Sequence, residues 1–358
     1  MQNVTLVLSF DHELSLGGAH SYERNLFEPT ERLLDLANEI QVPVCLLTDI
    51  LSAVRFESWD RSGFYEPYCR QIHRALGEGH EVQLHLHPHW LDVQLDGQRF
   101  VLGQRYSLSD FHGEAPPRDI AGIVRQGADA LTNICRQADP GWQCLAFRAG
   151  GYALGSHADL VLRTLWQSGV RVESSVAKGY FLKTRDSYVD FRHMPAAANW
   201  RVAPGGPLDQ PGTEGFFEVP IVAVPRNPWN NLPFLVKRVW HRRRYFDSGG
   251  IGFHDARGRV WDKLERLFPH TAWHLSFDYH THSARSLLRI LEGHMRAHAS
   301  DEHIYGAAIG HPKSMGPYQR QLMLEFVTLA RERFGERITF ATYSRVYQAI
   351  SGSTAHAS

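Results

Sequence analysis

Short apolar segments alternate with amphipathic segments through the first ninety residues of the chain. The first apolar run, Val4 to Phe10, is short and nearly continuous, which is typical of a strand buried on both faces. Similar runs return at residues 42–47 and 81–86, and amphipathic segments at residues 29–40 and 64–76 lie between them. Strands that alternate with helices in this way favour a parallel sheet with crossover helices.

The same alternation continues to about residue 350, with one interruption. Residues 177–255 are rich in proline and aromatic residues and contain one predicted strand, at 217–224. We interpret this region as an insertion in a single α/β domain that spans residues 1–350, and we predict a disordered tail at 351–358. The other predicted strands are 144–147, 170–174, 272–277, 304–309 and 338–341, and the other predicted helices are 118–137, 157–167, 260–267, 284–298 and 318–334.

The composition is that of a globular protein, with 43% hydrophobic and 21% charged residues in a chain of 358. Lys+Arg and Asp+Glu both number 38, so no net charge favours nucleic acid, and we expect no nucleic-acid partner. The basic run at residues 237–244 is typical of a solvated helix face. It could also contact a pyrophosphate or the surface of an anionic membrane.

The four cysteines show no Cys-x-x-Cys spacing, which favours core residues in a reducing compartment. The N-terminal apolar run has no basic start, and it ends at Asp11, too early for a signal peptide. We therefore predict a cytoplasmic protein. The oligomeric state is not indicated by the sequence.

Three histidines, His85, His87 and His89, follow the third predicted strand at two-residue intervals. An extended backbone places all three on one face, whereas a helical turn after Leu86 still brings His85 and His89 together as an i, i+4 pair. Because imidazole is the commonest metal-ligating side chain, this spacing predicts a metal site. The alternative is a histidine-rich surface turn in a chain that has 21 histidines.

Polar side chains also follow other predicted strands. Asp11-His12-Glu13 ends the first strand, Arg148 ends a later one, and His311 follows the strand at 304–309. In α/β folds, chemistry is concentrated at the C-terminal ends of the strands, so a closed sheet would bring these groups to one rim. The alternatives are a solvated turn at Asp11, a structural ion pair at Arg148 and a plain strand end at His311.

This ordered set of motifs resembles the polysaccharide deacetylase, or NodB-homology, family of carbohydrate esterases. Residues 9–13 are similar to its first motif, residues 79–89 to its Gly-His-Glu and His-x-x-x-His motif, residues 147–152 to its arginine motif and residues 310–313 to its last, histidine-bearing motif. The resemblance covers residues 4 to about 350, interrupted by the insertion.

The resemblance implies a distorted (β/α)7 barrel and a divalent metal, usually zinc or cobalt. It also implies that Asp11 is the general base, that Arg148 orients Asp11, that His85 and His89 are metal ligands, and that His311 is the general acid.

The third metal ligand is where the sequence departs from the family. An aspartate that the family places beside the first one is replaced by His12, so we favour Glu13 as the third ligand and retain His12 as the alternative. His87 has no family role. It either supports the metal ligands from behind or faces the substrate, and we assign it, together with Trp90 and Tyr152, to substrate binding.

The resulting functional hypothesis is a metal-dependent hydrolase that removes an N-acyl group, N-acetyl in particular, from a sugar. A cytoplasmic precursor of a surface polysaccharide is the favoured substrate. Two alternatives stay open: hydrolysis of a non-sugar linear or cyclic amide on the same fold, and a non-catalytic carbohydrate-binding protein.

Overall fold

The computed structural model describes residues 2–14, 21–96, 99–101, 103, 105–183, 188–226, 236, 237, 239, 240, 272–278 and 282–355. The predicted helix at 260–267 lies outside these residues, as do residues 238 and 241–244 of the basic run.

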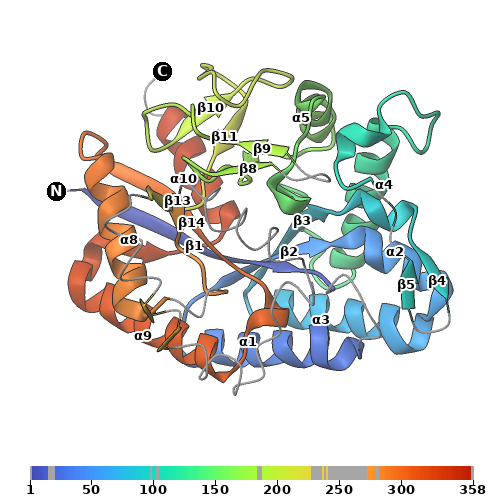
Figure 1. The fold of residues 1–358 in the computed structure, drawn as a ribbon, viewed down its shortest axis with the longest axis horizontal. Coiled ribbons are helices and arrows are strands. Elements are labelled where there is room, and N and C mark those ends of the chain that lie inside the picture. Colours follow the sequence, from blue (N-terminus) through green and yellow to red (C-terminus); the bar gives the residue numbers. More distant parts are fainter. Residues whose placement is uncertain are drawn as a thin grey trace.

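A mixed α/β architecture with one large, mainly parallel sheet organises the described chain (Figure 1). The order of its strands is β10-β11-β7-β6-β3-β2-β1-β14, and β15 pairs with β1. Within this sheet, as far as the described residues show it, only β10 pairs antiparallel, with β11. The strands of this sheet are β1 (Asn3–His12), β2 (Val44–Asp49), β3 (Glu81–Leu86), β6 (Ala146–Ala149), β7 (Val172–Glu173), β10 (Trp200–Val202), β11 (Phe216–Glu218), β14 (His303–Gly310) and β15 (Ile338–Phe340).

The sheet curls toward closure in the manner of a barrel (Figure 1). Beyond β11, Ile221 forms a parallel bridge with Ala307 of β14, and Ser276 forms another with Ile309. β11 therefore belongs to the main sheet, although it falls within the predicted insertion at 177–255. The predicted strand at 217–224 overlaps β11, but only residues 216–218 form a regular strand, and its pairing with β7 could not be read from the sequence.

Helices surround the sheet (Figure 1). The helix α2 was not predicted, because it follows β2 without a loop and lacks a clear start signal. The described α-helices are α1 (Glu28–Glu39), α2 (Ile50–Trp59), α3 (Glu66–Gly77), α4 (Ile120–Cys135), α5 (Ala158–Gln167), α8 (Ala284–Ala297), α9 (Pro317–Phe334) and α10 (Tyr343–Ala355).

Alternate residues of the central strands enter two separate hydrophobic clusters, as the period of two requires. The larger cluster includes Leu6 and Leu8 of β1 together with apolar residues of the surrounding helices. The smaller cluster takes the other face of the strands, with Val7 of β1 and Tyr343 of α10 among its members. The interior of the curled sheet is therefore a packed core that supports the strand ends above it.

Short elements complete the described structure. The strand pairs are β4 (Gln94–Asp96) with β5 (Arg99–Val101), β8 (Phe181–Lys183) with β9 (Tyr188–Asp190), and β12 (Ala223–Pro225) with β13 (Ala272–His274). The π-helical segments are η1 (Glu23–Phe27) and η2 (Arg61–Tyr65), and the 3-10 segments are η3 (Pro88–Leu91), η4 (Leu108–Phe111), η5 (Gly150–Tyr152), η6 (Pro312–Ser314) and η7 (Gly335–Arg337).

The end of the chain differs from the sequence prediction. The helix α10 includes residues 351–355, which we expected to begin a disordered tail, and residues 356–358 lie outside the described part. None of the helices in the described ranges is sufficiently long and apolar to cross a membrane.

Candidate active site

The register of the parallel strands aligns the polar strand ends. Asp11 of β1 lies beside Leu47 of β2, Asp49 of β2 lies beside His85 of β3, and His85 lies beside Arg148 of β6. Because these strands are parallel, their carboxyl ends share one edge of the sheet.

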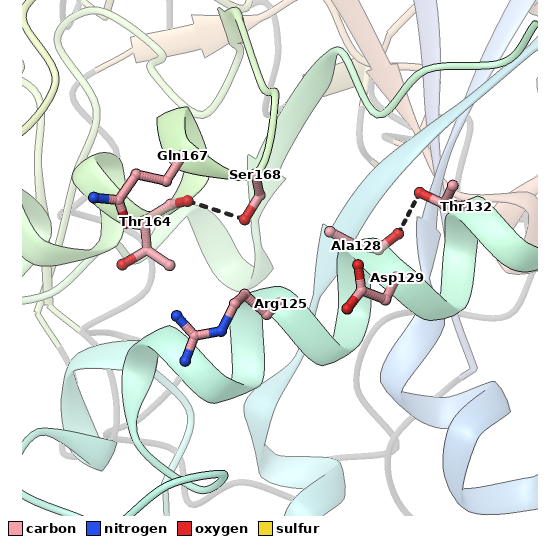
Figure 2. A pocket seen from close by; sticks show the side chains of 7 residues that line it. All are labelled: Arg125, Ala128, Asp129, Thr132, Thr164, Gln167 and Ser168. Carbon is pink, nitrogen blue, oxygen red and sulfur yellow. Dashed lines mark hydrogen bonds between the residues drawn. The ribbon is translucent and has the colours of Figure 1, made fainter.

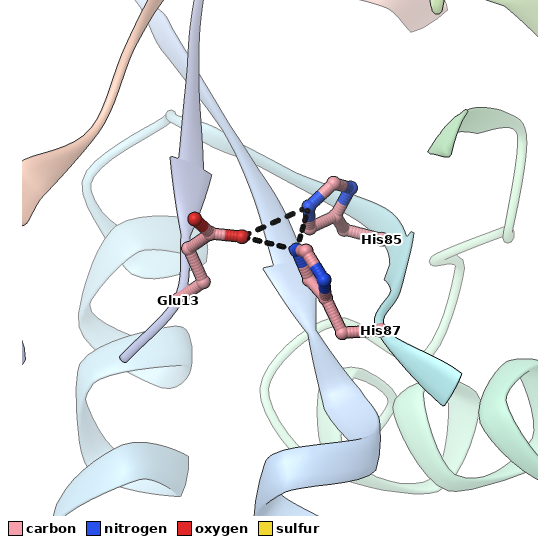
Figure 3. A group of neighbouring side chains, drawn as sticks. All are labelled: Glu13, His85 and His87. Atoms are coloured by element: carbon pink, nitrogen blue, oxygen red, sulfur yellow. Dashed lines mark hydrogen bonds and ion pairs between the residues drawn. The ribbon is translucent and has the colours of Figure 1, made fainter. Parts of the chain in front are cut away.

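Glu13, His85 and His87 converge at this edge (Figure 3). The Glu13 Oε2 atom lies 3.2 Å from His85 Nε2 and also contacts His87 Nε2, and the two Nε2 atoms are 3.1 Å apart. One ligand atom from each residue lies within 4.8 Å of the other two. The group combines one carboxylate and two imidazoles, which is a donor set that suits zinc and other divalent transition metals.

The hydrogen bond at the other ring nitrogen of His85 also suits a metal ligand. His85 Nδ1 lies 2.8 Å from the carbonyl oxygen of Arg148, so the ring donates its Nδ1 hydrogen there, and Nε2 is the ring atom that faces Glu13 and His87. Metal-ligating histidines are usually fixed in this way by a hydrogen bond at the other ring nitrogen. Zinc bonds of about 2.0–2.2 Å also span ligand atoms at these separations.

The predicted partner of His85 was His89, but the structure groups His85 with His87 instead. The backbone stays extended through His87, so His85 and His87 share a face, and the chain then turns into the 3-10 helix η3. His89 is 1% exposed, and among the described residues neither of its ring nitrogens has a hydrogen-bond partner. Its ring centroid is 5.1 Å from that of His87, so it stands beside the group rather than in it.

Gly150 makes the room that His87 occupies. A Cβ atom at Gly150 would lie 2.7 Å from His87 Nδ1 and 2.7 Å from the Leu86 carbonyl oxygen. No side chain fits there, so the glycine after β6 is explained by close packing against the histidine ring.

Asp11 and Arg148 form a buried ion pair next to the group. Arg148 Nη1 donates to Asp11 Oδ1 at 2.6 Å, and the exposed fractions are 0% for Arg148 and 4% for Asp11. Burial alone would raise the pKa of Asp11, but the charges of Arg148, His85 and His311 outweigh it and lower the pKa. The second carboxylate oxygen, Oδ2, lies 3.9 Å from His85 Nε2 and 3.6 Å from His311 Nε2.

His311 is held by Asp278, which received no role from the sequence. His311 Nδ1 and its backbone nitrogen each lie 2.9 Å from an Asp278 oxygen, which leaves Nε2 directed at Asp11 and Glu13. Burial alone would lower the pKa of His311, but Asp278, Glu13 and Asp11 raise it. The available signal was that Asp278 directly follows the predicted strand at 272–277, as site residues on other strands do.

Lys313 is a second site residue that the sequence did not single out. Its Nζ atom donates to Glu13 Oε1 at 2.6 Å, and the side chain is only 7% exposed. Burial would raise the pKa of Glu13, but Lys313 and His87 hold it well below its usual range. Glu13 therefore stays ionised, with Oε1 on the lysine and Oε2 toward the two histidines.

His12, the alternative third ligand, points away from this group. Successive residues of a strand alternate in direction, so Asp11 and Glu13 face the site, whereas His12 Nε2 lies 2.8 Å from Gln71 Oε1. Its ring also contacts Tyr68. The structure therefore places Glu13, and not His12, with the histidines.

Two residues predicted to bind substrate have different surroundings. Trp90 is 1% exposed and packs on Phe56, and its indole N–H donates to Asp49 Oδ2 at 2.6 Å, so it is a core residue in this structure. Tyr152 is half-buried after Gly150, with a φ of 63° that is rare for a residue with a side chain. Such strain is often concentrated at functional sites.

Asp49, at the end of β2, holds the backbone that carries His87. Its Oδ1 atom accepts the backbone N–H of His87 at 3.2 Å, and burial raises its pKa to about 6.

A surface pocket lies elsewhere, between α4 and α5 (Figure 2), and contains none of the predicted site residues. Its lining residues are Arg125, Ala128, Asp129, Thr132, Thr164, Gln167 and Ser168.

No protein-family model matches the chain, and no curated protein matches it. Among solved structures, the chain is similar to one described as a putative polysaccharide deacetylase from Mycobacterium smegmatis. The TM-score is 0.51 and the identity 12%, over 99% of this chain and 92% of that chain. These two chains share a fold. At this identity the likeness extends to the fold alone, and at that level it confirms the resemblance predicted from the motifs.

Two further solved structures are more distant. PuuE allantoinase gives a TM-score of 0.47 with 10% identity, over 96% of this chain and 89% of that chain. The 4-alpha-glucanotransferase from Thermococcus litoralis gives 0.46 with 9% identity, over 97% of this chain and 40% of that chain.

Proposed function

We propose that this protein is a metal-dependent hydrolase that removes an N-acyl group, N-acetyl in particular, from a sugar. The observation that carries the proposal is the buried convergence of Glu13, His85 and His87 beside the Asp11–Arg148 ion pair. A carboxylate and two imidazoles that converge on one point form a donor set for a divalent cation, and a neighbouring carboxylate held by arginine suits a general base.

The metal, zinc or another divalent ion such as cobalt, would be held by Glu13, His85 and His87. When bound, it would polarise the amide carbonyl and lower the pKa of the attacking water. Lys313 would fix the Glu13 carboxylate so that Oε2 faces the two histidines.

The chain's own residues supply the proton transfers. Asp11 Oδ2 is the oxygen that Arg148 does not occupy, so it would accept a proton from the attacking water. His311 Nε2, directed into the site by the Asp278 contact, would donate a proton to the departing nitrogen. An amide leaves poorly as an anion, so this second transfer is needed for the C–N bond to break.

The remaining features of the proposal follow from the sequence. We propose that the curled sheet is a (β/α)7 barrel, and that the substrate is a cytoplasmic nucleotide-linked or lipid-linked precursor of a surface polysaccharide. The four cysteines, all of them free thiols in the structure, support a reducing compartment as the location.

The proposal is tested by metal analysis of protein purified without a histidine tag, followed by an acetate-release assay. The substrate panel contains N-acetyl sugar nucleotides and, as the competing class, linear and cyclic amides. Asp11→Asn should abolish turnover and leave the metal bound, whereas the exposed control Asp129→Asn should behave as the unchanged protein. Full turnover by the Asp11 variant would overturn the assignment of the base.

The metal ligands are tested separately, without any turnover measurement. His87→Ala should lose stoichiometric zinc in equilibrium dialysis, because His87 provides one of three converging ligand atoms. His89→Ala should retain it. The reverse result would restore the His85–His89 pair that the sequence predicted.

A further inference from the structure

We propose that Tyr343, at the start of the C-terminal helix α10, is a positioning residue for the general base. It would act through Arg148, which holds Asp11, so the inference rests on the proposed function. None of the sequence motifs includes this tyrosine, because along the chain it is far from every strand end that carries a site residue.

Tyr343 reaches Arg148 from the interior of the curled sheet. The side chain is 0% exposed, and Arg148 Nη2 donates to its hydroxyl oxygen at 3.1 Å. The hydroxyl also lies 2.8 Å from Ser174 Oγ. Ser174 Oγ itself donates to the Val219 carbonyl oxygen at 2.7 Å, so the proton between the two hydroxyls comes from Tyr343.

This arrangement fixes the direction of each hydrogen bond around the guanidinium. Arg148 Nη2 donates to Ser9 Oγ at 2.7 Å and to Tyr343 at 3.1 Å, with a longer contact to Ser174 Oγ at 3.4 Å. Its Nε donates to the Ser174 carbonyl oxygen at 2.9 Å. The remaining edge, Nη1, is directed at Asp11 Oδ1. The planar guanidinium is therefore held on the sides away from the base, which sets the position of the edge that meets it.

The start of α10 is itself tied to the strand that carries the histidines. The Glu81 carboxylate, on β3, accepts the backbone N–H groups of Tyr343 at 2.7 Å and Ser344 at 2.9 Å. A carboxylate at a helix N-terminus is a favourable cap. The contacts from Glu81 to Tyr343 and from Tyr343 to Arg148 thus connect β3, α10 and β6. The buried Glu81 of the Gly-His-Glu motif therefore holds the start of α10 in place.

The decisive variant is Tyr343→Phe, which keeps the ring in the core and removes only the hydroxyl. Tyr347→Phe is the matched control, because Tyr347 lies one turn further along α10 and packs against the same apolar cluster. For Tyr343→Phe, kcat should fall about tenfold or more, the effect of one hydrogen bond to a charged group. KM should stay within about twofold, since no substrate contact is lost. A kcat within about twofold of the unchanged enzyme would overturn the proposal.

A structural readout separates this inference from the proposed function. If the unchanged protein hydrolyses nothing in the panel, the proposed function fails, but crystal structures of it and of Tyr343→Phe still decide the positioning role. A displaced contact between Arg148 and Asp11 would support the role, and an unmoved Arg148 would overturn it. If Tyr343→Phe does not fold, Ser174→Ala serves instead. It removes the acceptor of the Tyr343 hydrogen, together with a 3.4 Å contact between Ser174 Oγ and Arg148 Nη2. A joint displacement of the Tyr343 hydroxyl and Arg148 would support the proposal, and an unmoved Arg148 would overturn it.

Discussion

Replacing Arg148 with methionine should strongly destabilise the protein, because it would leave the buried Asp11 carboxylate without its cationic partner. Asp11 is 4% exposed, and its ion pair with Arg148 has a separation of 2.6 Å. Methionine has a comparable length and no charge, so it fills much of the space and supplies no hydrogen bond. The loss of the cation should also raise the pKa of Asp11, whose burial would no longer be offset.

The magnitude follows from the environment of the pair. Removal of one partner from a buried salt bridge costs about 3–5 kcal/mol, and whole domains are stable by only about 5–15 kcal/mol. Arg148 also donates to Ser9 and Ser174, whose hydroxyl and carbonyl oxygens would lose a donor in the variant. We therefore expect Arg148→Met to lower the free energy of unfolding by about 3–5 kcal/mol at neutral pH.

Denaturant unfolding of four proteins tests this reasoning: the unchanged chain, Arg148→Met, Asp11→Asn and the double variant. The double variant should be more stable than Arg148→Met alone, because it has no unpaired charge in the interior. A loss of less than about 1 kcal/mol in Arg148→Met, or a double variant that is less stable than the single one, would refute the argument from burial.

Three further outcomes can be measured. Gly150→Ala should weaken zinc binding in equilibrium dialysis, because the new methyl group would press on the ring of His87. The control is Gly77→Ala, where a Cβ atom meets nothing within 4 Å and zinc binding should be unchanged. Equal zinc affinity in the two variants would contradict the packing argument. Burial and a neighbouring histidine lower the pKa of His294 to about 4, so the unfolded chain binds the proton first as the pH falls. This histidine should therefore cost up to about 3 kcal/mol of stability between pH 6.5 and 4, and His294→Gln should flatten that decline; an unchanged pH profile of unfolding would argue against it. Asp278→Asn should lower kcat by about 10- to 100-fold in the acetate-release assay, because His311, which Asp278 orients, would lose its fixed tautomer. A normal kcat would exclude His311 from the proton transfer.

The sequence predicted the site best where a strand determines the direction of a side chain. β1 and β3 are apolar runs with polar ends, so the sequence alone places Asp11, Glu13 and His85 on one edge of a parallel sheet. Alternation along β1 also separates Glu13 from His12, which the motif comparison alone left open.

The choice between His87 and His89 could not be made in the same way. It depends on where the extended backbone ends, and the turn into the 3-10 helix η3 begins only after His87. The space for the His87 ring depends in turn on Gly150, which approaches from another strand. The spacing of the histidines in the sequence indicates neither where the extended backbone ends nor how closely Gly150 approaches.

The sequence by itself determined the alternating α/β architecture, the strands that end in polar residues and the residue types available for chemistry, because strand and helix periodicity are local properties of the chain. The tertiary structure alone decided which partner each site residue has. Asp278 meets His311, Lys313 meets Glu13 and Tyr343 meets Arg148 across separations of 33, 300 and 195 residues. Such contacts arise because the curled sheet brings distant strand ends together, and no local pattern encodes that distance.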